Sequence, residues 1–315
     1  MNKTGIAIHG GAGTILASQM TPELRAAYEE ALRAALHAGN NILQANGSAV
    51  DAVAAATVSL EDHLLFNAGR GSVFTRNGEH EMDASIMEGR NRMAGAIAGV
   101  RQVRNPIELA RAVMLKSEHV FLSGEGARNF ALEQGIRLEP ASYFFSQFRY
   151  DQWKAVRDSD QYMLDHSSPV EDLMKDKKFG TVGAVALDRQ GNLAAATSTG
   201  GMTNKNYGRI GDTPVIGSGT YANNATAAIS CTGHGELFIR SVAAYDVCAM
   251  MEYKHMSLEA AMQEVVMKKL KSIGGEGGMI GIDAAGNISL VFNSEGMYRG
   301  KIDHSGNVEV SIFRS

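Results

Sequence analysis

The 315-residue sequence predicts a layered α+β sandwich. Three copies of the pattern Asp-x-x-Gly-Asn begin at Asp188, Asp283 and Asp303, and each lies between two apolar runs. This pattern is typical of a tight hairpin, because glycine accepts the positive φ that such a turn needs. Two helical patterns, 235–251 and 257–270, separate the first hairpin from the other two. Strands, then helices, then strands are expected to pack as layers.

The N-terminal half predicts further strands and helices. Residues 5–8 form an apolar strand pattern that opens into a glycine-rich turn at 9–13. Thr21 before Pro22 predicts a helix start, because the threonine hydroxyl can cap the first turn and proline lacks an N–H that would have no partner there. Ser48 starts a second, alanine-rich helix. Similar patterns predict strands at 73–75, 82–87 and 94–100 and helices at 105–114 and 124–134.

A polar, charge-dense segment at about 151–180 interrupts these patterns. Its apolar periodicity is lost, so we expect a mobile linker with at most one helix, at its start. No other boundary is visible in the sequence, and the linker would lie inside one fold.

The composition is that of a globular protein, with 44% hydrophobic and 20% charged residues. A formal net charge of −4 gives no attraction to nucleic acid or to an anionic membrane. No apolar run approaches the ~18 residues of a membrane span. Cys231 and Cys248 do not make a disulfide framework, and Met1 leads into a strand pattern rather than a signal peptide. We therefore expect a cytoplasmic protein without a nucleic-acid or membrane partner.

The junction between Gly180 and Thr181 carries the first chemical hypothesis. A polar run ends at Gly180, and a buried strand begins at Thr181. If this peptide bond is cut, the new α-amino group of Thr181, with a pKa of roughly 7.7–8.0, can accept the proton of its own hydroxyl. Gly180 tolerates the strained geometry that such a cut requires. For this dipeptide alone, an ordinary strand start is the commoner explanation.

Three other loops carry side chains suited to amide chemistry. Thr199 lies in 194–205, where four hydroxyls stand beside two glycines, although a polar turn gives the same pattern. Arg209 and Asp212 can hold the carboxylate and the ammonium of an amino acid, although a surface ion pair is commoner. Thr232, between a strand and a helix, can help to stabilise an oxyanion or can cap the helix.

These stretches, in this order, resemble plant-type (type III) L-asparaginases, also called isoaspartyl peptidases, which belong to the N-terminal nucleophile (Ntn) hydrolases. Any one motif is weak, but their joint order and spacing is highly specific. The resemblance extends over essentially the whole chain. The stretches that carry it are 9–13, 66–69, 180–188, 197–201, 208–212 and 221–225.

The resemblance implies a four-layer αββα sandwich of the Ntn-hydrolase type. It implies cleavage between Gly180 and Thr181 into an α subunit, 1–180, and a β subunit, 181–315, which assemble as an (αβ)2 dimer. The implied activity is that of an isoaspartyl dipeptidase and L-asparaginase. Such an enzyme releases L-aspartate from β-aspartyl dipeptides and from L-asparagine through an aspartyl ester on Thr181.

The resemblance also implies the catalytic roles. Thr181 is the expected nucleophile, and Thr199 lies close to it and helps activation or cleavage. Thr232 and Gly233 are the expected oxyanion hole. No catalytic cofactor is implied.

Two binding sites follow from the same resemblance. Arg209 is expected to bind the substrate α-carboxylate, and Asp212 with Gly235 the α-ammonium, with Thr232 also counted among the substrate-binding residues. A structural Na⁺ is expected in the loop after residue 59, since a cage of backbone carbonyls suits a hard cation. The expected ligands are the carbonyl oxygens of Leu60, Glu61, His63, Phe66, Ala68 and Arg70.

Three residues depart from the family pattern. His234 stands where threonine or another small residue is expected, and its bulky, titratable ring can alter substrate access or the pH profile. Tyr207 stands where a proline is often found, and His63 replaces a small residue in the sodium loop. These departures bear on the choice between isoaspartyl dipeptides and asparagine, not on the reaction class.

Two alternative functions remain open from the sequence. A glycosylasparaginase-like amidase is disfavoured because that family carries His-Asp-Thr at the nucleophile and is secretory. This chain instead has Phe-Gly-Thr at 179–181. The other alternative is an uncleaved amino-acid-binding protein with an inert Thr181. Esterase, nucleotide-binding and metal-binding signatures are missing from the sequence.

Overall fold

The computed structural model describes residues 3–157 and 180–314. The strands are β1 (Gly5–Gly13), β2 (Met82–Glu88), β3 (Ala94–Val100), β4 (Phe121–Ser123), β5 (Thr181–Leu187), β6 (Leu193–Thr199), β7 (Thr220–Ala222), β8 (Ala227–Gly233), β9 (Gly277–Asp283), β10 (Ile288–Phe292), β11 (Gly296–Ile302) and β12 (Val308–Phe313). The α-helices are α1 (Pro22–Gln44), α2 (Ala49–Glu61), α3 (Pro106–Lys116), α4 (Gly124–Glu133), α5 (Ala141–Phe144), α6 (Gln147–Val156), α7 (Gly235–Ser241), α8 (Ala243–Lys254) and α9 (Leu258–Gln263). Short 3-10 helices are η1 (Ala17–Gln19) and η2 (Gly69–Gly71), and η3 (Glu264–Leu270) is a π-helix.

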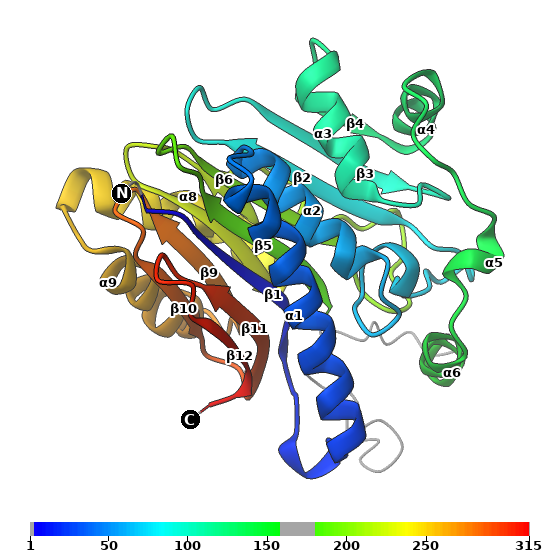
Figure 1. Ribbon diagram of the computed structural model, residues 1–315. Coiled ribbons are helices and arrows are strands. Elements are labelled where there is room, and N and C mark those ends of the chain that lie inside the picture. Colours follow the sequence, from blue (N-terminus) through cyan, green and yellow to red (C-terminus); the bar gives the residue numbers. More distant parts are fainter. Residues whose placement is uncertain (1–2, 158–179, 315) are drawn as a thin grey trace.

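Two β-sheets form the centre of the molecule (Figure 1). The large sheet has eight strands in the order β12-β11-β1-β5-β6-β2-β3-β4, and the small sheet has the order β10-β9-β8-β7. The sheets contact each other through β1, β5 and β6 on one side and β8 and β9 on the other. Strands β5 and β6 lie in the middle of the large sheet. The candidate nucleophile Thr181 begins β5, and Thr199 ends β6.

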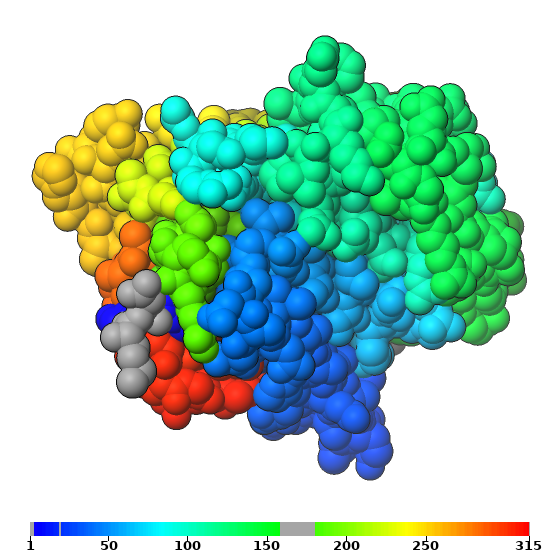
Figure 2. Space-filling view, turned by 45° about the horizontal axis from the view of Figure 1, so that its top comes forward, coloured from blue at the N-terminus to red at the C-terminus, as the bar shows by residue number. Residues whose placement is uncertain are grey.

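Helices flank both sheets, which confirms the predicted layered α+β arrangement. Helices α1 and α2 cross one face of the large sheet, and α3 packs on β2 and β3 (Figure 1). Figure 2 shows this face, with α1 and α2 in blue beside the green segments of α3 and α4. Helices α8, α9 and η3 contact the small sheet. Ala52 and Ala56 of α2 are fully buried, and their small side chains let the helix approach β5 and β6 closely. None of the helices within the described ranges is both long and apolar enough to cross a membrane.

The three predicted hairpins are confirmed as β5–β6, β9–β10 and β11–β12. In each turn the aspartate carboxylate accepts two backbone N–H groups. For Asp188 the donors are Gln190 and Asn192, both at 2.9 Å. The second oxygen of Asp188 also accepts the N–H of Ala49, at the start of α2, at 3.1 Å. The first hairpin is thereby tied to the helix that covers it.

The predicted helix caps are confirmed, because Thr21 accepts from the N–H of Leu24 and Ser48 from that of Asp51. One turn prediction and one strand prediction in the N-terminal half are wrong. The expected turn at 9–13 is a continuation of β1, which pairs with β11 as far as Gly13 through a bulge. The expected strand at 73–75 is reduced to an isolated bridge between Thr75 and Lys205.

The helical pattern at 235–251 is broken into α7 and α8 at Val242, whose φ is 46°. The pattern at 257–270 begins as α9, capped by Ser257, and continues as η3. A helix does begin the polar segment, since α6 covers its start as far as Val156. The rest of the predicted linker, 158–179, lies outside the described residues.

The carboxylate of Asp188 is expected to contribute more to stability than its counterparts in the other hairpins. Asp188 is 1% exposed, and its replacement by alanine leaves three backbone N–H groups without their acceptor. We expect Asp188→Ala to lower the free energy of unfolding by about 2–4 kcal/mol. The matched control is Asp303→Ala in an exposed turn of the same sequence pattern, with an expected cost of about 1 kcal/mol or less. Equal shifts in the urea midpoint would contradict the role of Asp188 at α2.

Candidate active site

Thr181 and Thr199 face each other across the β5–β6 hairpin, where they are Cα partners. The Thr181 hydroxyl donates to that of Thr199 over 3.4 Å. The Thr199 hydroxyl in turn donates to the carbonyl oxygen of Gly180 at 3.1 Å and accepts the N–H of Gly201 at 3.0 Å. One threonine hydroxyl thus contacts both the side chain and the peptide carbonyl of the expected cleavage junction.

Asn67 packs against this junction and holds two loops together. Its side-chain nitrogen donates to the carbonyl of Gly201 at 2.7 Å, and its side-chain oxygen accepts the N–H of Val73 at 3.0 Å. Gly180 is required here, because an added Cβ would lie 1.9 Å from the Asn67 Cβ. From the sequence, residue 67 was predicted only as part of a motif, without a role of its own. An isolated asparagine in a loop poor in side-chain charge was the available signal.

His9 holds the backbone of the candidate nucleophile. Its Nδ1 lies 2.9 Å from the carbonyl oxygen of Thr181, and its Nε2 lies 2.9 Å from the hydroxyl of Ser230. A carbonyl only accepts, so the ring proton is placed on Nδ1 and Nε2 accepts from the serine. Burial lowers the pKa of His9 to about 3, although the bond to Thr181 opposes that shift. The ring is therefore neutral and acts as a fixed hydrogen-bonding strut.

Arg209 and Asp212 meet at Gly235, but they do not form a surface ion pair. Arg209 instead donates from Nε and Nη2 to the two carboxylate oxygens of Glu236, each at 2.8 Å. A Cβ on Gly235 would lie 2.9 Å from both Arg209 Nη2 and Asp212 Oδ1, so glycine is needed where the two groups come together. The pairing of Arg209 with Glu236 was not predicted from the sequence.

Asp212 is 3% exposed, and its Oδ2 has no hydrogen-bond partner among the described residues. Burial raises the pKa of Asp212 to about 7, and the charge of Arg209 opposes the shift. The pair with Glu236 uses two of the five N–H groups of Arg209. A buried carboxylate beside a partly committed guanidinium provides complementary groups for an ammonium and a carboxylate.

Thr232 is buried one residue before the end of β8, and its hydroxyl oxygen accepts the N–H of Ala12 at 3.2 Å. The bond from Ala12 does not use the hydroxyl proton of Thr232, which can be donated to another acceptor. The alternative, that Thr232 caps a helix, is wrong, because the residue before α7 is His234. Gly233 is the last residue of β8, directly between Thr232 and His234.

A cavity of about 380 Å³ opens at Arg209. Tyr207 on its wall is 91% exposed and has a φ of 55°, a conformation that proline cannot adopt. The local backbone at this position is therefore incompatible with a proline. The lining residues are Met202, Lys205, Asn206, Tyr207, Arg209, His234 and Glu236.

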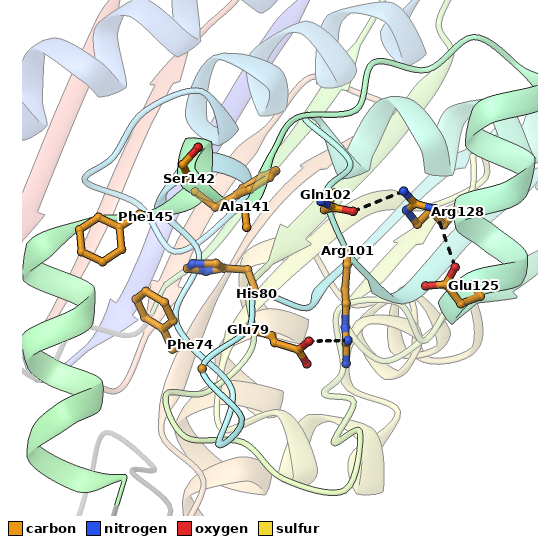
Figure 3. A pocket seen from close by; sticks show the side chains of 12 residues that line it. Phe74, Glu79, His80, Arg101, Gln102, Glu125, Arg128, Ala141, Ser142 and Phe145 are labelled. Atoms are coloured by element: carbon orange, nitrogen blue, oxygen red, sulfur yellow. Dashed lines mark hydrogen bonds and ion pairs between the residues drawn. The ribbon is translucent and has the colours of Figure 1, made fainter.

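A second cavity, of about 780 Å³, lies elsewhere and is shown in Figure 3. Phe74 and other aromatic side chains line one side of it. Its arginines pair with acids in the same wall, Arg101 with Glu79 at 2.8 Å and Arg128 with Glu125 at 3.9 Å. None of the candidate catalytic residues lines it. It is therefore not part of the candidate active site.

The loop 60–70 turns back on itself, so that Gly69 packs against Glu61 and Gly71 against Phe66. A Cβ on Gly69 would lie 2.6 Å from the carbonyl oxygen of Glu61, and one on Gly71 would lie 2.0 Å from that of Phe66. Backbone carbonyl oxygens are the kind of ligand that a hard cation prefers. Within the described ranges, no group of three His, Cys, Asp or Glu side chains could hold a metal ion.

The fold brings two threonine hydroxyls together at the Gly180–Thr181 junction, and it brings Arg209 and Asp212 together at Gly235. Residues 2–312 match the asparaginase family, and the chain belongs to that family. It is 54% identical over 300 residues to the isoaspartyl peptidase of Salmonella typhimurium, covering 95% of each chain. It is 53% identical to the isoaspartyl peptidase of Escherichia coli over 95% of this chain and 92% of that one. The isoaspartyl peptidase/L-asparaginase of Xenopus laevis is 42% identical over 94% of this chain and 91% of its own.

The burial of His9 is expected to make stability depend on acid pH. An unfolded histidine has a pKa near 6.5, and His9 in the fold has one of about 3, so below pH 6.5 the unfolded state binds the proton. Stability should therefore fall with decreasing pH, by about 1.4 kcal/mol per unit from this group. His9→Gln should lose that component of the slope although it is less stable at pH 8. His37→Gln, on the exposed face of α1, should keep the slope, as measured by urea unfolding from pH 4.5 to 8.

Proposed function

We propose that this chain is the precursor of an isoaspartyl peptidase with L-asparaginase activity, which cleaves its own peptide bond between Gly180 and Thr181. Family membership and the names of the relatives support the reaction class. The observation that carries the proposal is the Thr199 hydroxyl, which bridges the Thr181 hydroxyl and the Gly180 carbonyl. The two helix-covered sheets support the finer assignment to the four-layer αββα sandwich of the Ntn hydrolases.

Maturation begins with attack of the Thr181 hydroxyl oxygen on the carbonyl carbon of Gly180. Thr199 accepts the departing hydroxyl proton and donates its own to the carbonyl oxygen, whose developing charge it stabilises. The C–N bond then breaks as the proton on the former carbonyl oxygen passes, by way of Thr199, to the Thr181 nitrogen, and an ester links the two residues. Water hydrolyses the ester, which leaves the α subunit 1–180 with a carboxylate and the β subunit 181–315 with a free amine on Thr181.

In turnover the freed α-amino group is the general base for its own hydroxyl, with a pKa of roughly 7.7–8.0. The Thr181 oxygen attacks the side-chain carbonyl of an aspartyl substrate. The hydroxyl of Thr232 and the N–H of Gly233 stabilise the oxyanion, and the protonated amine delivers its proton to the leaving amine. Water then hydrolyses the aspartyl ester and releases L-aspartate. Because the chain supplies base and nucleophile, this mechanism needs no catalytic cofactor.

The substrate is oriented by its two α-substituents. Arg209 binds the α-carboxylate, and Asp212 binds the α-ammonium with Gly235 leaving the room for it. The unpartnered Oδ2 of Asp212 supports this role, since an ammonium would satisfy the buried oxygen. β-Aspartyl dipeptides and L-asparagine share this aspartyl end, which is why one site can serve both.

The proposal extends to assembly, cation and compartment. The cleaved subunits associate as an (αβ)2 dimer, as the resemblance implies. A Na⁺ ion fixes the loop through carbonyl oxygens, and the turned-back geometry of 60–70 supports it. Cys231 and Cys248 are both buried and unpaired, which supports a reducing, cytoplasmic compartment. The proposed Na⁺ ligands are the carbonyls of Leu60, Glu61, His63, Phe66, Ala68 and Arg70.

Self-cleavage is tested by intact mass of purified protein after prolonged incubation at neutral pH. Scaling 33.6 kDa by 180 and 135 of 315 residues gives fragments of about 19 and 14 kDa, the smaller beginning at Thr181.

Thr181→Ala should abolish both cleavage and hydrolysis of a β-aspartyl dipeptide, whereas Thr181→Ser should retain part of both. Thr199→Ala should slow cleavage. Turnover by Thr181→Ala would exclude Thr181 as the nucleophile, and an uncleaved wild type that binds L-aspartate would favour a binding protein.

The meeting point of Arg209 and Asp212 is tested by Gly235→Ala. The added Cβ would lie 2.9 Å from both groups, so we expect the Kd for L-aspartate to rise roughly 10- to 100-fold, the equivalent of one or two lost hydrogen bonds. Self-cleavage should be unaffected. Gly126→Ala, on exposed helix α4 where a Cβ meets nothing within 4 Å, is the matched control. Unchanged aspartate affinity in Gly235→Ala, measured by calorimetry, would argue against this binding site.

The proposed Na⁺ is tested by thermal unfolding in sodium chloride and in choline chloride of equal ionic strength. A cation that binds only the folded loop raises Tm, by a few degrees for a stabilisation of about 1–2 kcal/mol. The melting temperature should be higher in sodium. Identical curves in the two salts would mean that the loop holds no sodium under these conditions.

A further inference from the structure

His234, Glu236 and Arg209 form a row of three charged or titratable side chains along the wall of the 380 Å³ cavity. Arg209 Nη2 donates to Glu236 Oε2 at 2.8 Å, and His234 Nε2 lies 3.6 Å from that same oxygen. The backbone N–H of His234 donates to the carbonyl of Glu276 at 3.0 Å, which fixes the residue at the start of α7. The Glu236 carboxylate thus contacts both His234 and Arg209.

Negative charge exceeds positive charge around Arg209 once a substrate carboxylate is bound. In the free site Glu236 balances Arg209, and the hydrogen bonds from Arg209 keep the pKa of Glu236 below its usual value although burial opposes them. An arriving α-carboxylate brings a second anion to the same guanidinium. Two carboxylates on one arginine repel each other in a partly desolvated site. A further positive charge beside Glu236 would relieve that repulsion.

We propose that His234 is a positioning residue that supplies this charge: its protonated ring acts through Glu236 on Arg209, so that binding of the substrate α-carboxylate is coupled to proton uptake by His234. The inference rests on the proposed function, because it takes the aspartyl carboxylate as the ligand of Arg209. It also gives a physical role to the residue at which this chain departs from the family pattern. A threonine at 234 could not carry the charge.

The surroundings of His234 favour its neutral form in the free site. The ring is faced by Glu236 on α7, by Arg209 from the preceding loop and by Glu276 from the segment before β9. Burial lowers its pKa below 6.5, Arg209 lowers it further, and the two glutamates oppose these effects. An added carboxylate near Arg209 raises the histidine pKa again. By linkage, the protonated protein then binds that carboxylate more tightly.

Asp212 gives the opposite pH dependence and must be separated from His234. Its pKa is about 7 in the free site, and it must be ionised to bind an ammonium, so aspartate affinity through Asp212 weakens as the pH falls. This contribution is common to wild type and to variants at position 234. The difference between them at each pH therefore isolates the histidine.

The test measures binding of L-aspartate to the matured protein by calorimetry between pH 5 and 8.5. His234→Gln and His234→Thr should bind about three- to tenfold more weakly than wild type at pH 5.5, where the wild-type ring takes up its proton, and equally well at pH 8.5, where it does not. Wild type should take up protons on binding at pH 6, seen as a dependence of the heat on buffer ionisation, and the variants should take up fewer. Glu236→Gln should remove the pH-dependent difference between histidine and glutamine at 234. His119→Gln, at an exposed position, should behave as wild type.

The outcomes separate this inference from the proposed function. Weakening of both variants by the same factor at every pH would mean a merely structural role for His234 and would overturn the inference. So would proton uptake that persists unchanged in His234→Gln. Neither of these two outcomes would contradict the proposed self-cleavage and turnover. No binding of L-aspartate by wild type at any pH would overturn the inference together with the carboxylate site assigned to Arg209.

Discussion

The register of the β5–β6 hairpin is the constraint on which the site depends. Its turn is fixed by the Asp188 carboxylate, and Thr181 and Thr199 are the pair farthest from that turn. A slip of one residue would move every side chain of the strand to the opposite face of the sheet. The Thr199 hydroxyl would then no longer reach the Gly180 carbonyl. A local hydrogen-bonding pattern at one end of two strands thus sets the reacting geometry at the other end.

Several buried side chains around this hairpin are ionisable, whereas the cores between the helices and the sheets are apolar. His9, Glu61, Asp83 and Asp212 are all buried. Burial raises the pKa of Glu61 to about 8, against hydrogen bonds from Ser198 and the Ile107 N–H, and raises that of Asp83 as well. Groups of this kind destabilise a fold unless they are neutral or paired. Their concentration near the candidate nucleophile is typical of a site that is arranged for chemistry rather than for stability alone.

Signals that act within a few residues could be predicted from the sequence. The three aspartate turns and the caps at Thr21 and Ser48 each depend on one side chain and the backbone next to it. Val242 could not be predicted as a helix break, because valine disfavours the left-handed conformation and only tertiary packing imposes it. The continuation of β1 depended on pairing with a strand almost 300 residues later in the chain.

The same distinction holds for the site. Thr181, Thr199, Arg209, Asp212 and Thr232 were singled out as sequence motifs, and the structure brings Thr181 to Thr199 and Arg209 to Asp212. The partner of Arg209 is Glu236, 27 residues away on another element, and no local pattern connects the two. Asn67 likewise acts through contacts with residues 200–201, which only the fold supplies.

Strand order gives the proposed cut between Gly180 and Thr181 a topological consequence. In the large sheet, β1 of the N-terminal fragment lies between β11 and β5 of the C-terminal fragment, and β6 borders on β2 of the N-terminal one. The two polypeptides would be interleaved, so neither could leave without dismantling the sheet. The precursor can fold as one chain, but the matured protein, once denatured, would have to reassemble from two. The proposed cut would thus fix the order of events, because each active copy has to fold before it is cut.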